Sequence, residues 1–300
     1  MTFDYIDTPE ALAALAAALA GSPWIALDTE FVRERTYYPQ LALIQVASDR
    51  RVACVDPLAL ESLEPLLAVL YDPAVTKVLH SARQDLEIFF HLRRAPPCPV
   101  FDTQRAAALL GQGEHIGYAD LVKQLLGVEL DKSQTRTDWH RRPLDPAQLA
   151  YAADDVRYLR EVYQCQRAAL EAAGLLERLA ADCAGLCDPR HYCLRSEDAW
   201  RRVKGHRQLR GVQLAVLRAL AAWREEQAIA ADRPRRWIVG DDVLLTLARR
   251  LPEDRPRLRA VPGLAGATLK RHGDALLELI AAARREPAQD WPRLPARASR

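Results

Sequence analysis

The stretch Trp24–Glu30 constrains this chain more than any other, because an apolar run there ends in two carboxylates. Turn-forming residues at positions 21–23 precede it, and its length is typical of a buried strand. Side chains two apart on a strand point to the same face, so Asp28 and Glu30 should project together. Two such carboxylates repel each other, and one stays protonated unless a cation lies between them. The alternative is a strand that ends in solvent with both acids hydrated.

The charge of the chain is divided unevenly along its length. Its 300 residues suggest about two domains. Residues 201–300 carry 22 Lys and Arg against 11 Asp and Glu, which leaves 20 against 29 in residues 1–200. This asymmetry predicts a basic module that meets nucleic acid, joined to an acidic module with another role. The alternative is two solvated surfaces that differ by chance.

The sequence favours a cytoplasmic protein without a membrane segment. No apolar run reaches the ~18 residues of a membrane span, and the acidic stretch 1–10 lacks the features of a signal peptide. We therefore expect all six cysteines to be free thiols. A zinc site is disfavoured because the one candidate cluster lacks a CxxC knuckle; it comprises Cys183, Cys187, His191 and Cys193.

Strand and helix patterns alternate through the first 170 residues. Strands are predicted at 24–30, 41–46, 51–55 and 75–79, and helices at 9–20, 62–71, 83–92 and from 146 onward. This order predicts a mixed α/β sheet covered by helices on both faces. A polar loop over 130–143, which carries Trp139, lacks periodicity and is placed to touch substrate.

The pattern changes after about residue 188. Amphipathic stretches predict helices at 208–230 and 241–250, followed by two short pieces, one through 269 and one at 274–283. These helices form a small all-α domain. The Pro-containing tail 287–300 should be loose.

Helix starts can be assigned from capping residues. Thr8 before Pro9 is an N-cap, and Asp102 is interpreted as a structural N-cap rather than a catalytic acid. Asp145, followed by Pro146 and by Gln148 at N3, predicts a capping box.

The helix after this capping box carries two candidate active-site residues. Tyr151 and Asp155 lie four residues apart and therefore share one face. Asp154 turns away from that face and should be solvated.

Four carboxylates should meet at one edge of the sheet: Asp28, Glu30, Asp85 and Asp155. Oxygen-only ligands of this charge suit Mg²⁺ or Mn²⁺ rather than zinc. Two such ions ~3.5–4 Å apart activate water for phosphoryl displacement, and Tyr151 could hold or deprotonate that water.

The motifs resemble those of the DEDDy 3′→5′ exonucleases, and within them the ribonuclease D family. Three motifs carry the resemblance, namely Leu27–Phe31, His80–Asp85 and Tyr151–Val156. The loop matches through Lys132–Thr135 and Asp138–Trp139, and the C-terminal part resembles an HRDC domain through Pro234–Val239 and Arg271–Gly273. The sequence departs from the pattern in carrying Asp154 as a fifth acid and in ending after one HRDC-like region, where the family usually has two.

The resemblance implies a ribonuclease H-like mixed sheet with flanking helices, followed by a small all-α HRDC-like domain. The implied boundaries are an exonuclease domain at 1–190, a linker at 191–205, the HRDC-like domain at 206–286 and a loose tail at 287–300. The implied activity is metal-dependent 3′→5′ exoribonuclease cleavage of RNA 3′ ends by two metal ions, in the processing of tRNA precursors and other small structured RNAs. The implied protein is a cytoplasmic monomer.

The resemblance also assigns roles to single residues. Asp28, Glu30 and Asp155 would bind the metal on the nucleophile side, with Asp28 bridging to a second metal that Asp85 supports. Tyr151 would position the attacking water. Substrate-binding residues would be Thr29, Phe31, His80 and Trp139.

Two other functions stay open at the level of sequence. The same acids serve proofreading DNA exonucleases, and only contacts to a 2′-hydroxyl distinguish RNA from DNA. A non-catalytic RNA-binding protein on the same scaffold would have lost a carboxylate.

Overall fold

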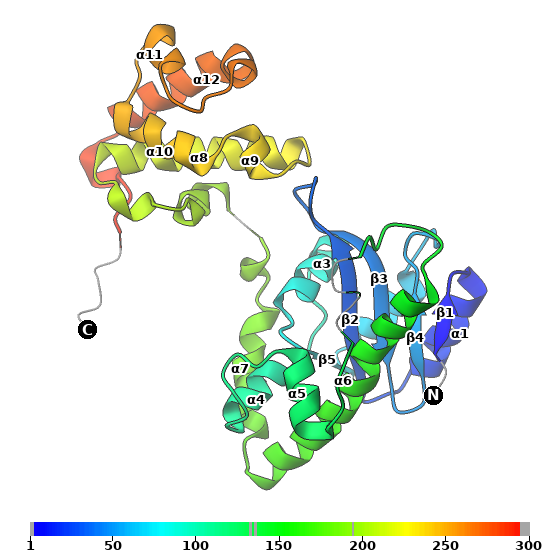
Figure 1. The fold of residues 1–300 in the computed structure, drawn as a ribbon. Coiled ribbons are helices and arrows are strands. Elements are labelled where there is room, and N and C mark those ends of the chain that lie inside the picture. Colours follow the sequence, from blue (N-terminus) through cyan, green and yellow to red (C-terminus); the bar gives the residue numbers. More distant parts are fainter. Residues whose placement is uncertain (1–2, 132–133, 135–136, 194, 295–300) are drawn as a thin grey trace. The chain divides into compact units, whose positions relative to one another are not determined.

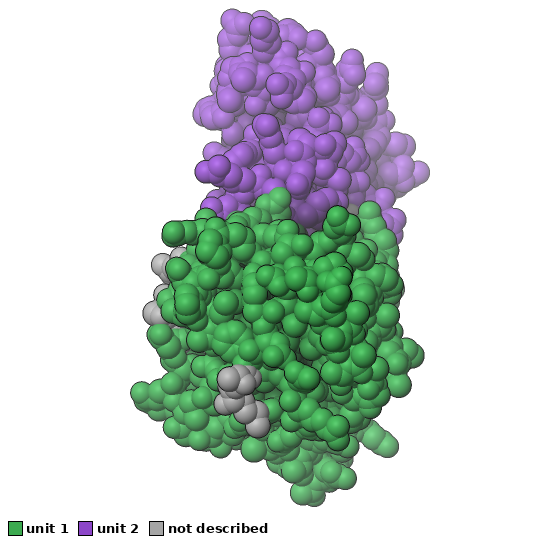
Figure 2. Space-filling model, turned by 90° about the vertical axis from the view of Figure 1, so that its right-hand side faces the viewer, with its two compact units in different colours: residues 1–32, 39–192 green, residues 33–38, 193–300 purple. Residues whose placement is uncertain are grey.

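The computed structural model describes residues 3–131, 134, 137–193 and 195–294. The chain divides into two compact units, coloured separately in Figure 2. Unit 1 comprises residues 1–32 and 39–192, and unit 2 comprises residues 33–38 and 193–300. Part of the predicted loop motif, at positions 132, 133 and 135, and the end of the predicted tail, at 295–300, lie outside the described residues.

Unit 1 is built on one six-stranded mixed sheet in the order β1-β4-β3-β2-β5-β6. Strands β2 and β3 pair antiparallel, as do β3 and β4, whereas the remaining neighbours are parallel. The predicted mixed sheet is confirmed, with two added edge strands. The strands are β1 Asp4–Ile6, β2 Trp24–Val32, β3 Gln40–Ala47, β4 Val52–Val55, β5 Thr76–Leu79 and β6 Val100–Asp102.

Helices cover both faces of this sheet (Figure 1). One face packs against α1 Pro9–Leu19, α2 Glu64–Leu70 and α3 Arg83–Arg93. The long helix α6 Pro146–Ala172 crosses the other face and contacts β2, β3, β4 and β5. Around it lie α4 Thr103–Leu109, α5 Tyr118–Leu126 and α7 Leu176–Ala184. Side chains of β2 point alternately to the two faces of the sheet. Ile25 and Leu27 therefore enter the apolar core on the α1–α3 face, and Trp24 and Ala26 enter the core on the α6 face.

The predicted helix caps of unit 1 are confirmed. The Thr8 hydroxyl accepts a hydrogen bond from the amide of Ala11 at the start of α1. Asp102 caps α4, and Asp145 with Gln148 forms the capping box that starts α6. Because this box fixes where α6 begins, it also fixes the rotation of every later side chain on that helix.

Two of the six cysteines are paired, which corrects the expectation of free thiols. Cys98 and Cys187 form a disulfide across 89 residues of sequence, and Cys54, Cys165, Cys183 and Cys193 are free. Cys98 precedes β6, whereas Cys187 ends the short 3₁₀ helix η1 Gly185–Cys187, which is followed by η2 Pro189–His191. Local sequence does not reveal that the fold brings these two segments together.

Unit 2 is helical, as predicted. Its helices are α8 Val212–Ala230, α9 Arg235–Ile238, α10 Asp241–Arg250, α11 Arg255–Arg259 and α12 Gly266–Arg285, with 3₁₀ turns η3 Ser196–Arg202, η4 His206–Gln208 and η5 Ala288–Asp290. Trp200 and Val203, within the predicted linker, enter the apolar core beside Leu217 and Leu220.

Three details of unit 2 differ from the predictions. Helix α8 begins at Val212, four residues later than expected. Helix α10 is preceded by Gly240, and Asp241 instead pairs with the buried Arg224. The two short pieces after position 262 are one helix, α12, which runs through Gly273 without a break. Among the described residues no helix is long and apolar enough to cross a membrane.

Candidate active site

Strand β2 and helix α6 bring three carboxylates together, as the sequence predicts. Asp28 and Glu30 leave the same face of β2, and Asp155 extends from α6 above that face. One carboxylate oxygen of each residue lies within 4.8 Å of the others. The register of β2 against β3 shifts between Glu30 and Phe31, and the pairing then continues with Phe31 opposite Leu41, so the irregularity lies directly after the acids.

Asp85 is the fourth acid, and it reaches the site from the first turn of α3. Its side chain is only 7% exposed and accepts a hydrogen bond of 2.5 Å from the hydroxyl of Thr29. Thr29 lies between Asp28 and Glu30 on β2 and points to the opposite face. The hydroxyl of Thr29 therefore ties the fourth acid to the strand that carries the first two.

Burial raises the pKa of all four acids, and the charge of another acid of the group adds to this at Asp28, Glu30 and Asp155. Burial, then the charges of Asp85 and Asp155, raises the pKa of Asp28 well above its usual value. Burial and the charge of Asp28 raise the pKa of Glu30 to about 9. Burial raises the pKa of Asp85 to about 6, and burial with the charge of Glu30 raises the pKa of Asp155. The cluster is therefore electrostatically unfavourable without a cation.

The donor set fits a hard divalent cation. Within the described part of the chain, none of the four carboxylates forms an ion pair with a basic side chain. Carboxylate oxygens at this spacing are the ligands that Mg²⁺ and Mn²⁺ prefer.

The buried side chain of Gln45 is a second indication of a binding site beside the acids. It lies opposite Asp28 in the β2–β3 register and is fully buried. Both its amide nitrogen and its amide oxygen lack a hydrogen-bond partner among the described residues. An unpaired buried amide is costly, and residues opposite each other on a sheet lie on the same face. The Gln45 amide is therefore available to Asp28 or to a water beside it.

Tyr151 lies one turn before Asp155 on α6, and its side chain is half-buried. Its ring stacks at an angle on that of Trp139, with centroids 6.2 Å apart. Trp139 itself is only 3% exposed. The loop before α6 thus supports the tyrosine ring from one side.

The other predicted substrate-binding residues have different surroundings. Phe31 is half-buried at the end of β2. His80 contacts the hydroxyl of Thr103 through Nδ1 at 2.9 Å and the carbonyl of Ile116 through Nε2 at 3.2 Å. These two contacts fix the orientation of the His80 ring.

Tyr118 is a neighbour of the site that sequence reasoning missed. Its hydroxyl donates to the backbone carbonyl of Asp155, and its ring lies 5.5 Å from that of His80. Burial and the charges of Asp155 and Asp28 raise its pKa, so it stays protonated. Neither the helix at 118–126 nor this contact is predicted from the sequence. Asp154, predicted to be solvated, forms an ion pair with Arg157, and its charge helps to raise the pKa of Asp155.

Two family models match the chain. A model described as 3′-5′ exonuclease matches residues 3–170, and a model described as HRDC domain matches residues 213–280. The chain is also 45% identical over 296 residues to ribonuclease D of Acidiphilium cryptum. This alignment covers 97% of this chain and 74% of that protein.

Two solved structures are similar to this chain. RNase D of Escherichia coli, described as an exoribonuclease involved in structured RNA processing, superposes with a TM-score of 0.89 at 40% identity, covering 98% of this chain and 78% of that one. NrnC of Brucella melitensis, solved with bound Mg²⁺, matches with a TM-score of 0.54 at 26% identity, covering 64% of this chain and 92% of that one.

Proposed function

This chain belongs to the ribonuclease D family and is a 3′→5′ exoribonuclease; from this premise we propose how its own residues carry out the reaction. The observation that carries the proposal is the meeting of three carboxylates within 4.8 Å, with a fourth attached through Thr29. Asp28, Glu30 and Asp155, with Asp85, hold two divalent cations, Mg²⁺ or Mn²⁺. The Mg²⁺ in the related NrnC structure supports this choice of metal.

When bound, the cations lower the pKa of the attacking water and neutralise charge on the phosphoryl oxygens. The protein supplies the positions of the ligands. Thr29 holds Asp85 by donating a hydrogen bond from its hydroxyl, and the capping box at Asp145 fixes the rotation of Asp155. The buried Gln45 amide, which has no hydrogen-bond partner among the described residues, would orient Asp28 or a water beside it from the neighbouring strand.

Tyr151 orients the attacking water through its hydroxyl. Its place one turn from Asp155 supports this role, since such residues share a helix face. Packing against Trp139 restricts the ring and thereby lowers the entropy cost of holding the water.

Four residues are proposed to serve binding of the 3′-terminal nucleotides, by contact or by positioning. Phe31 offers a half-exposed aromatic ring to a base at the end of β2. Thr29 acts by holding Asp85, His80 acts through its fixed ring, and Trp139 acts through the orientation of Tyr151.

Unit 2 is proposed to hold RNA. It carries the basic surplus of the chain, and Trp237 on α9 is 59% exposed next to Arg236. Arginines and exposed aromatic rings together bind single-stranded RNA through phosphates and stacked bases. The proposed division is an exonuclease domain at 1–190, a linker at 191–205, an HRDC-like domain at 206–286 and a tail at 287–300.

The proposed substrates are tRNA precursors and other small structured RNAs, acted on by a monomer in the cytoplasm. The test is cleavage of a tRNA with a 3′ extension and of matched single-stranded DNA, each with and without Mg²⁺. We expect stepwise shortening of the tRNA only with the metal. Equal or faster cleavage of the DNA would contradict the assignment to RNA.

A further inference from the structure

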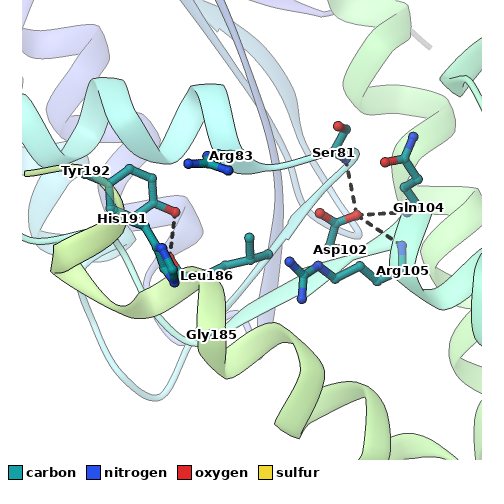
Figure 3. Close-up of a pocket in the computed structure, with 9 residues that line it drawn as sticks. All are labelled: Ser81, Arg83, Asp102, Gln104, Arg105, Gly185, Leu186, His191 and Tyr192. Carbon is teal, nitrogen blue, oxygen red and sulfur yellow. Dashed lines mark hydrogen bonds between the residues drawn. The ribbon is translucent and has the colours of Figure 1, made fainter. Parts of the chain in front are cut away.

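A pocket of about 250 Å³ lies in unit 1 beside the start of α3, and Figure 3 shows the residues that line it, none of which is one of the four acids. Three segments line it: the end of β5 with the first residues of α3, the start of α4, and the segment 185–192 after α7. The last segment is held by the Cys98–Cys187 disulfide and by the Tyr192 hydroxyl, which donates to the Leu186 carbonyl at 2.6 Å. These two interactions fix the segment 185–192, which forms one wall of the pocket.

Two guanidinium groups reach into this pocket from different helices. Arg83 begins α3, and Arg105 lies in the first turn of α4 (Figure 3). Arg105 donates to the Asp182 carbonyl, which orients its side chain. The backbone amide of Arg83 donates to the Ser81 carbonyl, whereas its guanidinium makes no hydrogen bond or ion pair with any described residue. Both positive charges act on the Tyr192 hydroxyl, opposing the burial that raises its pKa to about 12, so they face the same space.

The carboxylate that lines the pocket, Asp102, does not neutralise these arginines. Its side chain is buried and accepts hydrogen bonds from four backbone amides, at distances from 2.9 to 3.3 Å. These amides belong to Ser81, Ala82, Gln104 and Arg105. The negative charge of Asp102 is thus engaged by the backbone at the starts of α3 and α4. His191 adds a further polar side chain at the opposite wall.

We propose that this pocket binds a phosphate group, held between the Arg83 and Arg105 guanidinium groups. Planar guanidinium groups bind phosphate oxygens through paired N–H donors, and an unpaired arginine in a concave site is suited to that role. The phosphate comes either from the backbone of a bound RNA strand or from a free phosphate or nucleotide product. The first source is consistent with the position of Arg83, two residues before Asp85 on the same helix.

The RNA source rests on the proposed function, whereas binding of phosphate itself does not. The first experiment therefore uses the full chain in EDTA, without RNA. Inorganic phosphate is titrated while NMR follows the side-chain Nε–H signals of Arg83, Arg105 and the exposed Arg50, which lies outside the pocket. We expect the first two signals to shift with one common affinity and the Arg50 signal to stay in place. In Arg83→Gln the Arg105 shift should need about tenfold more phosphate, as expected when one charge-assisted hydrogen bond is removed.

The second experiment separates the two sources. RNA affinity is measured in EDTA over a range of salt for wild type, Arg83→Gln and the control Arg50→Gln. If a strand phosphate occupies the pocket, Arg83→Gln lowers the slope of log affinity against log salt by about 0.7, and Arg50→Gln leaves it unchanged. An unchanged slope together with phosphate-dependent shifts supports a free phosphate or nucleotide as occupant. Signals of Arg83 and Arg105 that do not respond to phosphate, with an unchanged slope, overturn the proposal.

Discussion

Replacing Asp28 with Asn should make the metal-free protein more stable while abolishing its activity. In the wild type, Asp28 is the charged neighbour that most raises the pKa of Glu30, after burial itself. An amide at this position is nearly isosteric and removes that charge. The variant therefore loses a metal ligand and relieves repulsion in the same step.

The magnitude follows from the titration of Glu30. Its folded pKa is about 9, above its unfolded value, so the native state retains a proton that the unfolded state releases. Stability is thus fully present at low pH and falls as pH rises toward the folded pKa, by about 1.4 kcal/mol per pH unit for each such proton. Between pH 6.5 and 8.0 this amounts to about 2 kcal/mol from Glu30 alone.

The assay is thermal unfolding followed by circular dichroism, in EDTA and in Mg²⁺, from pH 6 to 8.5. We expect wild-type Tm in EDTA to fall by several degrees over this range, at about 2–4 °C per kcal/mol. Asp28→Asn should show a shallower fall and a smaller gain from Mg²⁺ at pH 8. Glu114→Gln, an exposed acid in the same unit, is the matched control and should behave as wild type.

A variant that is less stable than wild type in EDTA at pH 8 would refute this reasoning. It would mean that Asp28 is held by favourable contacts rather than by a cation. Equal Mg²⁺ stabilisation of wild type and variant would likewise show that the metal binds elsewhere.

Three further predictions concern single features of the two units. Tyr151→Phe should lower kcat by about 10²–10⁴-fold with unchanged metal affinity, measured by single-turnover cleavage; an unchanged rate would leave the hydroxyl without a role in holding water. Gln45→Leu should weaken Mg²⁺ binding by about 10–100-fold in calorimetry, because the orienting amide is removed, and equal affinity would contradict that role. Changing the exposed Arg233, Arg236 and Lys270 of unit 2 to Gln should flatten the salt dependence of RNA affinity by about 0.7 for each phosphate that is no longer neutralised; parallel lines would exclude unit 2 from RNA binding.

The parts of the site that follow local rules could be predicted from sequence. The alternation of β2 places Asp28 and Glu30 on one face, and the capping box sets the rotation of α6 and hence of Asp155. Each rule depends only on residues that are close in sequence. It therefore applies wherever the strand or helix forms, whatever the rest of the fold.

Features that depend on long-range packing could not be predicted in this way. The contact of Tyr118 with Asp155 joins α5 to α6, and the Cys98–Cys187 pair joins segments 89 residues apart. The unpaired amide of Gln45 emerges only from the β2–β3 register. The break expected between Leu269 and Asp274 is wrong, because a glycine inside a helix costs only about 1 kcal/mol, which the packing of α12 against α8 and α11 outweighs.

The most direct test of the central claim is the direction and metal dependence of cleavage. A 3′-extended tRNA labelled at its 5′ end is incubated with wild type and with Asp155→Asn, in EDTA and in Mg²⁺. We predict a ladder that shortens one nucleotide at a time with wild type and Mg²⁺, and intact RNA in EDTA or with the variant. Release of a short labelled 5′ fragment at the outset, or a ladder from Asp155→Asn at the wild-type rate, would contradict a 3′→5′ exonuclease site built on these carboxylates.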